Sequence, residues 1–105
     1  PAFAMPVASL ARPDRAPSGE STARTYLRFI VADRAGVLAE ITAAMRDADV
    51  SIESLSQRGV TAEGAAVVAM VTHECREANV AKALALLEGS DSLKAAPMVM
   101  PILEV

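Results

Sequence analysis

Cysteine, histidine and aromatic side chains are scarce in this sequence of 105 residues, which holds one Cys, one His, one Tyr, two Phe and no Trp. A zinc site needs three or four protein ligands, so His73 and Cys75 cannot supply one. A Cys–His catalytic pair needs an orienting third group, which a short run at a strand end does not provide. We therefore expect no metal and no catalytic residue, and a surface or helix-entry role for both side chains.

Basic charge and long apolar runs are also lacking. The net charge is −3, whereas a protein that binds nucleic acid needs a basic surface. The positions where RNA-binding sheets of comparable topology carry stacking aromatics are here Val67, Ala69 and Val71. No apolar run reaches the length of a membrane span, and no glycine-rich nucleotide motif occurs. A lone Cys75 cannot form an internal disulfide, which indicates a reducing, cytoplasmic compartment. Partners of the nucleic-acid and membrane classes are therefore not expected.

Proline marks the first part of the chain, because four of the six prolines are Pro1, Pro6, Pro13 and Pro17. The stretch 16–21 has the composition of a linker. We expect residues 1–24 to be a connector from an upstream catalytic domain and residues 25–105 to form one ordered domain.

Hydrophobic periodicity predicts four strands and two helices in that domain. Leu27, Phe29 and Val31 alternate with polar positions and predict a strand with one buried face. Helical spacing predicts one helix over 37–48 and another over 80–87 that Gly89 closes. The apolar run 65–71 predicts a central strand buried on both faces, and residues 98–105 predict a final strand.

The second strand changes the phase of its apolar positions between Ile52 and Leu55. This change indicates either a β-bulge or a strand covered on both faces. The complete order is then β-α-β-β-α-β, which predicts an α+β, ferredoxin-like sandwich. Its four-stranded antiparallel sheet has both helices on one face, and its second and fourth strands lie at the edges.

Pro101 lies in the last predicted strand and Pro97 directly precedes that strand, four residues earlier. Proline removes a ladder hydrogen bond, so it is tolerated only on an open edge. The prolines therefore protect the fourth-strand edge against pairing. The second strand has no such protection, and we expect a homodimer to form through its edge.

The turn between the first strand and the first helix is the best candidate site. Gly36 and Val37 are expected to present free backbone N–H groups at a helix N-terminus, where a carboxylate can bind. Asp33 could accept a hydrogen bond from an ammonium group. This combination suits a free α-amino acid. The alternative is structural: Asp33 caps the helix and Gly36 makes the turn.

The second strand holds an unusual density of small polar side chains, namely Ser51, Ser54, Ser56 and Gln57. They could bind a small ligand or a neighbouring subunit. The alternative is an exposed face at the edge of the sheet.

Three stretches of the sequence carry a family resemblance. Residues 26–41 (YLRFIVADRAGVLAEI), 49–57 (DVSIESLSQ) and 71–73 (VTH) resemble an ACT domain, and most nearly the C-terminal ACT domain of the homoserine dehydrogenase family. The resemblance covers about residues 25–104. It implies a domain that senses an end product, most often threonine. It also implies allosteric control of a fused NAD(P)-dependent oxidoreductase that interconverts aspartate semialdehyde and homoserine, with no cofactor in the regulatory domain itself.

The resemblance also assigns ligand-binding roles. Asp33 and the backbone amides of Gly36, Val37 and Leu38 would hold the amino and carboxylate groups of the ligand. Three further residues would line the other side, across a dimer interface: Ser51, Ile52 and Gln57. The chain departs from the family pattern in two places, since Ala35 replaces a proline and Ser51 replaces an asparagine. Both changes predict a looser turn or a weaker hold on the ligand. The functional alternative is a structural dimerisation module without a ligand.

Overall fold

The computed structural model describes residues 21–60 and 64–103, so most of the predicted connector and the end of the last predicted strand lie outside the described residues. The elements are β1 (Thr22–Ala32), α1 (Val37–Asp47), β2 (Ile52–Val60), β3 (Ala65–Thr72), β4 (Cys75–Arg76), α2 (Glu77–Leu87) and β5 (Met98–Ile102). The first strand begins at Thr22, so residues 22–24 are part of the sheet.

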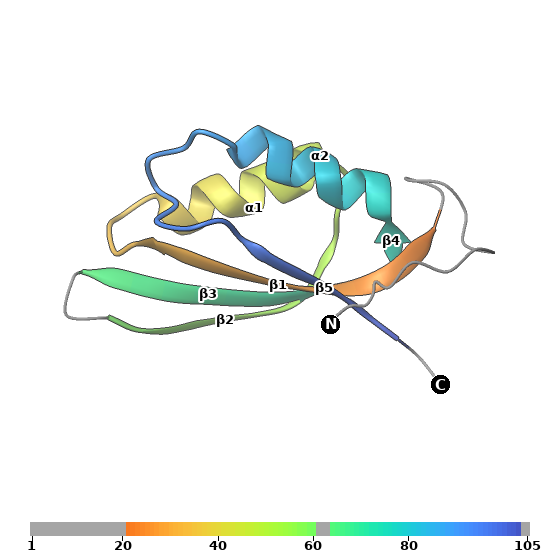
Figure 1. The fold of residues 1–105 in the computed structure, drawn as a ribbon, viewed down its shortest axis with the longest axis horizontal. Helices are drawn as coiled ribbons and strands as arrows, with labels where there is room; N and C mark the ends of the chain where they lie inside the picture. Colours follow the sequence, from red (N-terminus) through yellow and green to blue (C-terminus); the bar gives the residue numbers. More distant parts are fainter. Residues whose placement is uncertain (1–20, 61–63, 104–105) are drawn as a thin grey trace.

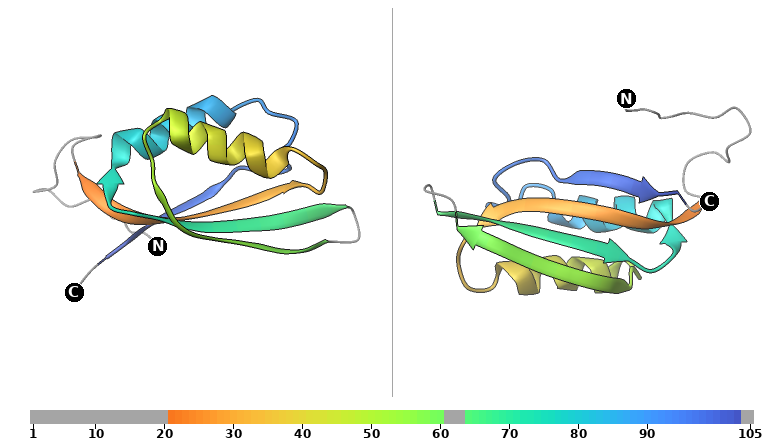
Figure 2. Two further views of the ribbon diagram at one scale, coloured as in Figure 1. Left: turned by 180° about the vertical axis from the view of Figure 1, so that it is seen from behind. Right: turned by 90° about the horizontal axis from the view of Figure 1, so that it is seen from below.

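The sheet is antiparallel, with β2, β3 and β1 side by side and β5 paired to the other side of β1. Both helices cover one face of the sheet, with α1 beside β2 and α2 nearer to β5 (Figures 1 and 2). The ferredoxin-like arrangement and the edge positions of the second and last long strands are thus confirmed.

The structure adds a fifth strand that the periodicity does not predict. The two residues of β4 pair with the start of β1, Arg76 opposite Thr22 and Cys75 opposite Ala23. Helix α2 follows immediately, so Cys75 lies at a helix entry as expected. A two-residue bridge carries no periodic signal, because alternation needs at least four positions to be visible.

The core lies between the sheet and the two helices. On β1 it holds Leu27, Phe29 and Val31, which are at most 2% exposed. Ile41 and Met45 on α1 and Val80 and Leu87 on α2 pack into the same cluster. The alternation in β1 and the helical stripes therefore place their apolar residues as predicted.

One prediction about β3 is wrong. Ala66, Val68 and Met70 are buried against the helices, but Val67 and Ala69 on the opposite face are only half-buried. A continuous apolar run does not distinguish a strand covered on both faces from one with an apolar open face. Helices cover only one side of the sheet in the described part of the chain (Figure 1).

A β-bulge, the first of the two predicted causes, explains the change of phase of the apolar residues in β2. The register shifts between Ile52 and Ser54, so Glu53 is the extra residue of a β-bulge. The bulge turns both Ile52 and Leu55 toward the helix side of the sheet. Coverage on both faces is ruled out, because residues 53–59 are exposed.

The C-terminal end of α2 is closed by Gly89 as predicted. Helix α2 stops at Leu87, and Gly89 follows with a φ angle of 83°, a left-handed conformation that glycine adopts without steric cost. Strand β5 contains Pro101, and Pro97 directly precedes it. Among the described residues β5 pairs with β1 alone, which agrees with the edge position that a proline in a strand requires.

Candidate functional site

The turn between β1 and α1 consists of residues 33–36, all of them exposed. Gly36 is the N-cap residue of α1 and has φ 91° and ψ −15°. This left-handed conformation is strained for any residue with a Cβ, which explains the glycine at the last position of the turn. The turn is held from below by the Asp33 backbone N–H, which donates to the Gly64 carbonyl oxygen at 3.0 Å.

No side chain in the described residues caps the N-terminus of α1. The structural alternative, in which the Asp33 side chain caps this helix, is therefore wrong. The first helical bond runs from the Glu40 N–H to the Gly36 carbonyl oxygen at 2.9 Å. The N–H groups of Val37 and Leu38 precede it, and a helix lacks internal partners for these donors. The helix dipole and these donors favour an anionic group at this point.

A polar network joins this turn to the loop between α2 and β5. Arg34 Nη2 donates to Asp91 Oδ1 at 2.7 Å and to Ser92 Oγ at 3.0 Å. Glu40 accepts hydrogen bonds from the Ser90 and Ser92 hydroxyls at 2.6 and 2.7 Å. Ser92 is 4% exposed and also accepts the Ala32 N–H through its carbonyl oxygen. The network fixes the first turn of α1 against a distant segment of the chain.

The same network changes the acidity of Glu40. Hydrogen bonds from Ser90 and then Ser92 stabilise the carboxylate and lower the pKa of Glu40 below its ordinary value of 4.5. Sequence reasoning missed these residues, because Arg34 and Ser92 are 58 positions apart. The one available signal was a Ser-Asp-Ser run in the loop after α2.

The other predicted ligand residues lie at the opposite end of α1. Ser51 is exposed and Ile52 is half-buried, and both line a hollow of about 260 Å³. Thr42, Arg46, Asp49 and Val50 complete its lining. Helix α1 has 11 residues, so Ser51 and Ile52, which follow its C-terminal end, lie about 16 Å from the β1–α1 turn.

Gln57 lies further along β2, opposite Val68, on the helix side of the sheet. Ser54 and Ser56 alternate with it and face the other side. The polar residues of the second strand thus divide between two faces and do not form one cluster. Within one copy the structure brings together Asp33, Gly36, Val37 and Leu38, but not Ser51, Ile52 or Gln57.

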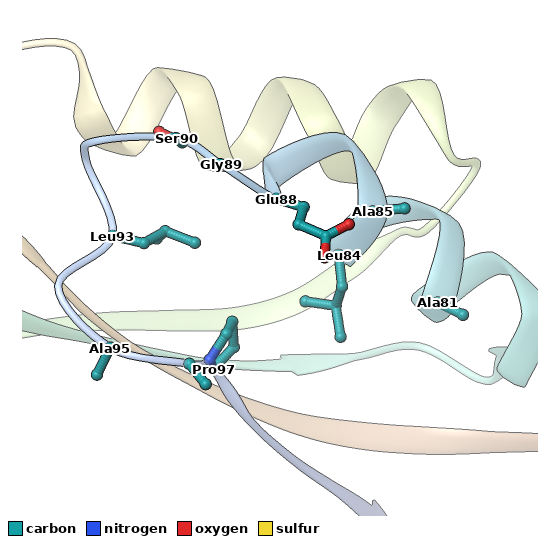
Figure 3. Close-up of a pocket in the computed structure, with 10 residues that line it drawn as sticks. Ala81, Leu84, Ala85, Glu88, Gly89, Ser90, Leu93, Ala95 and Pro97 are labelled. Carbon is teal, nitrogen blue, oxygen red and sulfur yellow. The ribbon is translucent and has the colours of Figure 1, made fainter.

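A larger hollow of about 580 Å³ lies between α2 and the loop that leads to β5 (Figure 3). Small and apolar side chains line most of it, among them Ala81, Leu84, Leu93 and Pro97. Glu88 is the charged residue of this lining. No predicted ligand residue takes part, and the lining has no charged or polar cluster of the kind that would orient an amino acid.

The described residues contain no group of three or more His, Cys, Asp and Glu side chains that could hold a metal ion. His73 is exposed, while Cys75 is half-buried with its Sγ atom 3.7 Å from the Thr72 hydroxyl. Neither helix α1 nor α2 has the length and apolarity that crossing a membrane requires, and the described residues include no other α-helix.

Known proteins resemble this chain in both sequence and fold. The homoserine dehydrogenase of Neisseria gonorrhoeae (strain ATCC 700825 / FA 1090) is 35% identical over 78 residues, which cover 74% of this chain and 18% of that protein. The homoserine dehydrogenase of Synechocystis sp. (strain ATCC 27184 / PCC 6803 / Kazusa) is 34% identical over 87 residues, covering 83% and 20%. The crystal structure of a homoserine dehydrogenase from Thiobacillus denitrificans matches with a TM-score of 0.71 at 28% identity, covering 80% of this chain and 18% of that one.

The chain therefore spans about a fifth of the length of these homoserine dehydrogenases. The resemblance to an ACT domain of the homoserine dehydrogenase family is confirmed by these relatives and by the match to the ACT domain family. Residues 25–90 match the ACT domain family itself, from the first third of β1 to three residues past the end of α2. With this match and the ferredoxin-like order of strands and helices, the chain belongs to the ACT domain family.

Proposed function

We propose that this chain is the regulatory domain of a homoserine dehydrogenase and that two copies together bind a small amino acid, with threonine as the first candidate. The observation that carries the proposal is the position of the two half-sites. The turn Asp33–Leu38 and the pair Ser51–Ile52 lie at opposite ends of α1, about 16 Å apart. A ligand the size of threonine cannot contact both in one copy.

Pairing through the β2 edge removes this separation. Among the described residues strand β2 pairs with β3 alone, so its other edge is open, and α1 lies beside that edge (Figure 2, right). Rotating a second copy by 180° about an axis perpendicular to the sheet, beside β2, sets the two α1 helices antiparallel. The turn of one copy then approaches Ser51 and Ile52 of the other, so each dimer has two equivalent sites.

The surface beside this edge has the composition that such a contact needs. Leu38, Thr42 and Arg46 recur at intervals of four and share one face of α1. Leu55 of β2, which is 36% exposed, lies on the helix side of the same edge. Burying Leu55 and Leu38 between two copies supplies the apolar centre of the interface.

The chemistry of the joined half-sites suits an α-amino acid. The N–H groups of Val37 and Leu38 at the open helix end bind the α-carboxylate. The carboxylate of Asp33 accepts from the α-ammonium group. Ser51 of the other copy offers its hydroxyl group to the ligand's side chain, and this polar contact favours threonine over an aliphatic amino acid such as isoleucine. Gln57 lies six residues further along the chain, about 20 Å from Ser51 by the rise of an extended strand, so it stands outside this site.

Regulation follows because the bound ligand stabilises one arrangement of the two copies over others. A ligand that touches both copies favours the arrangement in which the half-sites meet, and that preference reaches the attached dehydrogenase as a coupling free energy. The dehydrogenase part binds NAD(P) and carries the catalytic residues, in the cytoplasm. Threonine as an end product then acts as a feedback signal.

Isothermal titration calorimetry on the dimeric chain tests the proposal, with threonine as ligand and serine, isoleucine and methionine as comparators. We expect a saturable heat with threonine that Asp33→Ala abolishes. Glu88→Ala, which removes an exposed carboxylate at the end of α2, is the matched control and keeps the heat. A dimeric sample that gives no heat with any of the four amino acids would support the alternative of a ligand-free dimerisation module.

A further inference from the structure

The face of the sheet opposite the helices is apolar over most of its area. We call it the outer sheet face. Side chains alternate along each strand, so the residues that lie between the buried ones point to this side. Its apolar members are Tyr26, Ile30, Val67, Ala69, Val71, Met98, Met100 and Ile102.

No described element covers this face (Figures 1 and 2). Met100 is 52% exposed, and the other apolar members are half-buried by their neighbours in the sheet. A contiguous apolar surface of this kind marks an interaction site in a folded protein.

Among the described residues the outer sheet face carries three arginines, and only one of them is paired with a carboxylate. Arg24 makes a two-pronged ion pair with Glu53, with N–O distances of 2.9 and 3.0 Å. Arg28 and Arg58 are exposed and have no ion-pair partner among the described residues. The outer sheet face is therefore positive, although the chain as a whole carries −3.

These charges decide against a second copy of this chain as the occupant. Stacking two outer sheet faces would enclose both pairs of unpartnered arginines, and the described residues of the face supply no free carboxylate, since Glu53 is already engaged by Arg24. A buried charge without a partner is strongly destabilising. The complementary surface is an apolar one that carries carboxylates.

The size of the face indicates how the occupant is attached. From strand spacing and rise, four strands over seven residues present roughly 450 Å². This is less than the roughly 800 Å² per partner of stable complexes between separate proteins, but it suits contacts between domains of one chain. A covalently linked neighbour has a high effective concentration and needs less area to stay bound.

We propose that the outer sheet face docks on the remaining part of the same polypeptide, at an apolar surface with two carboxylates set about 12 Å apart to meet Arg28 and Arg58. The inference rests on the proposed function, in which this chain is one domain of a longer dehydrogenase. It leaves the β2 edge free, so docking and pairing use different surfaces. Contact through this face gives the regulatory domain a direct path to the domain it controls.

Photo-crosslinking in the full-length polypeptide tests the proposal. p-Benzoylphenylalanine replaces Met100 on the outer sheet face, and in a matched control it replaces Leu86 on α2, which is also 52% exposed. We expect position 100 to crosslink to a segment outside these 105 residues, within one polypeptide as judged by mixing isotope-labelled and unlabelled protein. Position 86 should give less of this product.

Charge reversal then tests the role of the arginines. Arg28→Glu combined with Arg58→Glu should lower the yield of the position-100 crosslink several-fold, whereas Arg76→Glu on β4 should leave it unchanged. An absent crosslink, a crosslink to the same face of a second copy, or a yield indifferent to both reversals would each overturn the proposal. Threonine calorimetry and homoserine dehydrogenase assays on the same protein test the proposed function separately. A failure of the docking proposal can therefore be distinguished from a failure of the proposed function.

Discussion

The hydroxyl of Ser92 donates a hydrogen bond to the Glu40 carboxylate at 2.7 Å, and it also accepts one from Arg34 at 3.0 Å. Ser92 thereby links the loop before β5 to the first turn of α1. The link matters for the site, because the same turn of α1 presents the open N–H groups.

Ser92→Ala removes both of these hydrogen bonds. Because Ser92 is 4% exposed and its partners are polar, we expect a loss of about 1–2 kcal/mol in the free energy of unfolding. Urea denaturation measures it. Ser56→Ala, at an exposed position of β2, is the control and should change stability by less than about 0.5 kcal/mol. Equal effects of the two substitutions would contradict the structural role of the network.

Glu40 makes stability depend on pH at the acid end. Because the hydrogen bonds from Ser90 and Ser92 lower its pKa in the folded state, its contribution is fully present above the ordinary value of 4.5. It is lost as the pH falls through the lowered folded pKa. We expect Glu40→Gln to be less stable than the parent at neutral pH and to lose less stability below ~4.5. Urea unfolding at several pH values gives the pH dependence of the free energy of unfolding for the parent and for Glu40→Gln. An equal pH dependence in the two proteins would refute the prediction.

Gly36→Ala should destabilise the chain through its backbone alone. A Cβ at this position would meet no atom within 4 Å, but the φ angle of 91° costs an alanine about 1–2 kcal/mol. Gly59→Ala is the matched control, since its Cβ also meets nothing and its φ angle is not positive. Thermal unfolding of both variants separates the strain of a positive φ angle from the general effect of replacing glycine by alanine. We expect a lower Tm for Gly36→Ala only.

Thr72 is fully buried, and its hydroxyl accepts the backbone N–H of Thr25 at 3.0 Å. Thr72→Val keeps the shape and removes this acceptor, which leaves a buried N–H without a partner. We expect a loss of about 1–3 kcal/mol in urea unfolding. Thr72→Ser keeps the acceptor and loses one methyl group, so its cost should be smaller. The reverse order would show that packing, and not this hydrogen bond, holds β1 to the end of β3.

Leu55→Asp tests the β2 edge as the pairing surface. Leu55 is 36% exposed on the helix side of that edge, so an aspartate there costs the monomer little but places a desolvated charge at the interface. Light scattering after size exclusion should report a monomer, and the heat of threonine binding should disappear with the dimer. Met100→Asp, on the outer sheet face, is the control that keeps both. If the Leu55→Asp chain is still a dimer, the interface does not lie at the β2 edge.

Most of the fold could be predicted because its signals are local. The alternation of Leu27, Phe29 and Val31 and the helical stripe through Ile41 and Met45 are properties of neighbouring residues, and the structure buries these side chains. The turn before α1 was equally local, since a glycine between a predicted strand and a predicted helix favours a turn, and Gly36 adopts a left-handed conformation there. The β-bulge at Glu53 left its trace in the change of phase along β2.

Other features depended on distance in space. The link from Arg34 and Glu40 to Ser92 joins positions more than fifty residues apart, and no local pattern encodes such a pair. The open face of β3 was misjudged for the same reason, because an apolar run reports hydrophobicity and not what covers it.

Local periodicity and turn chemistry thus determined the order of elements, the core and the conformation at Gly36, since each depends on interactions within a few residues of the chain. Tertiary packing alone decided that the β1–α1 turn is tied to the Ser90–Ser92 loop. It also decided that Arg28 and Arg58 share an apolar face of the sheet that no described element covers. These relationships arise where strands far apart in sequence become neighbours, and only the closed sheet fixes that proximity.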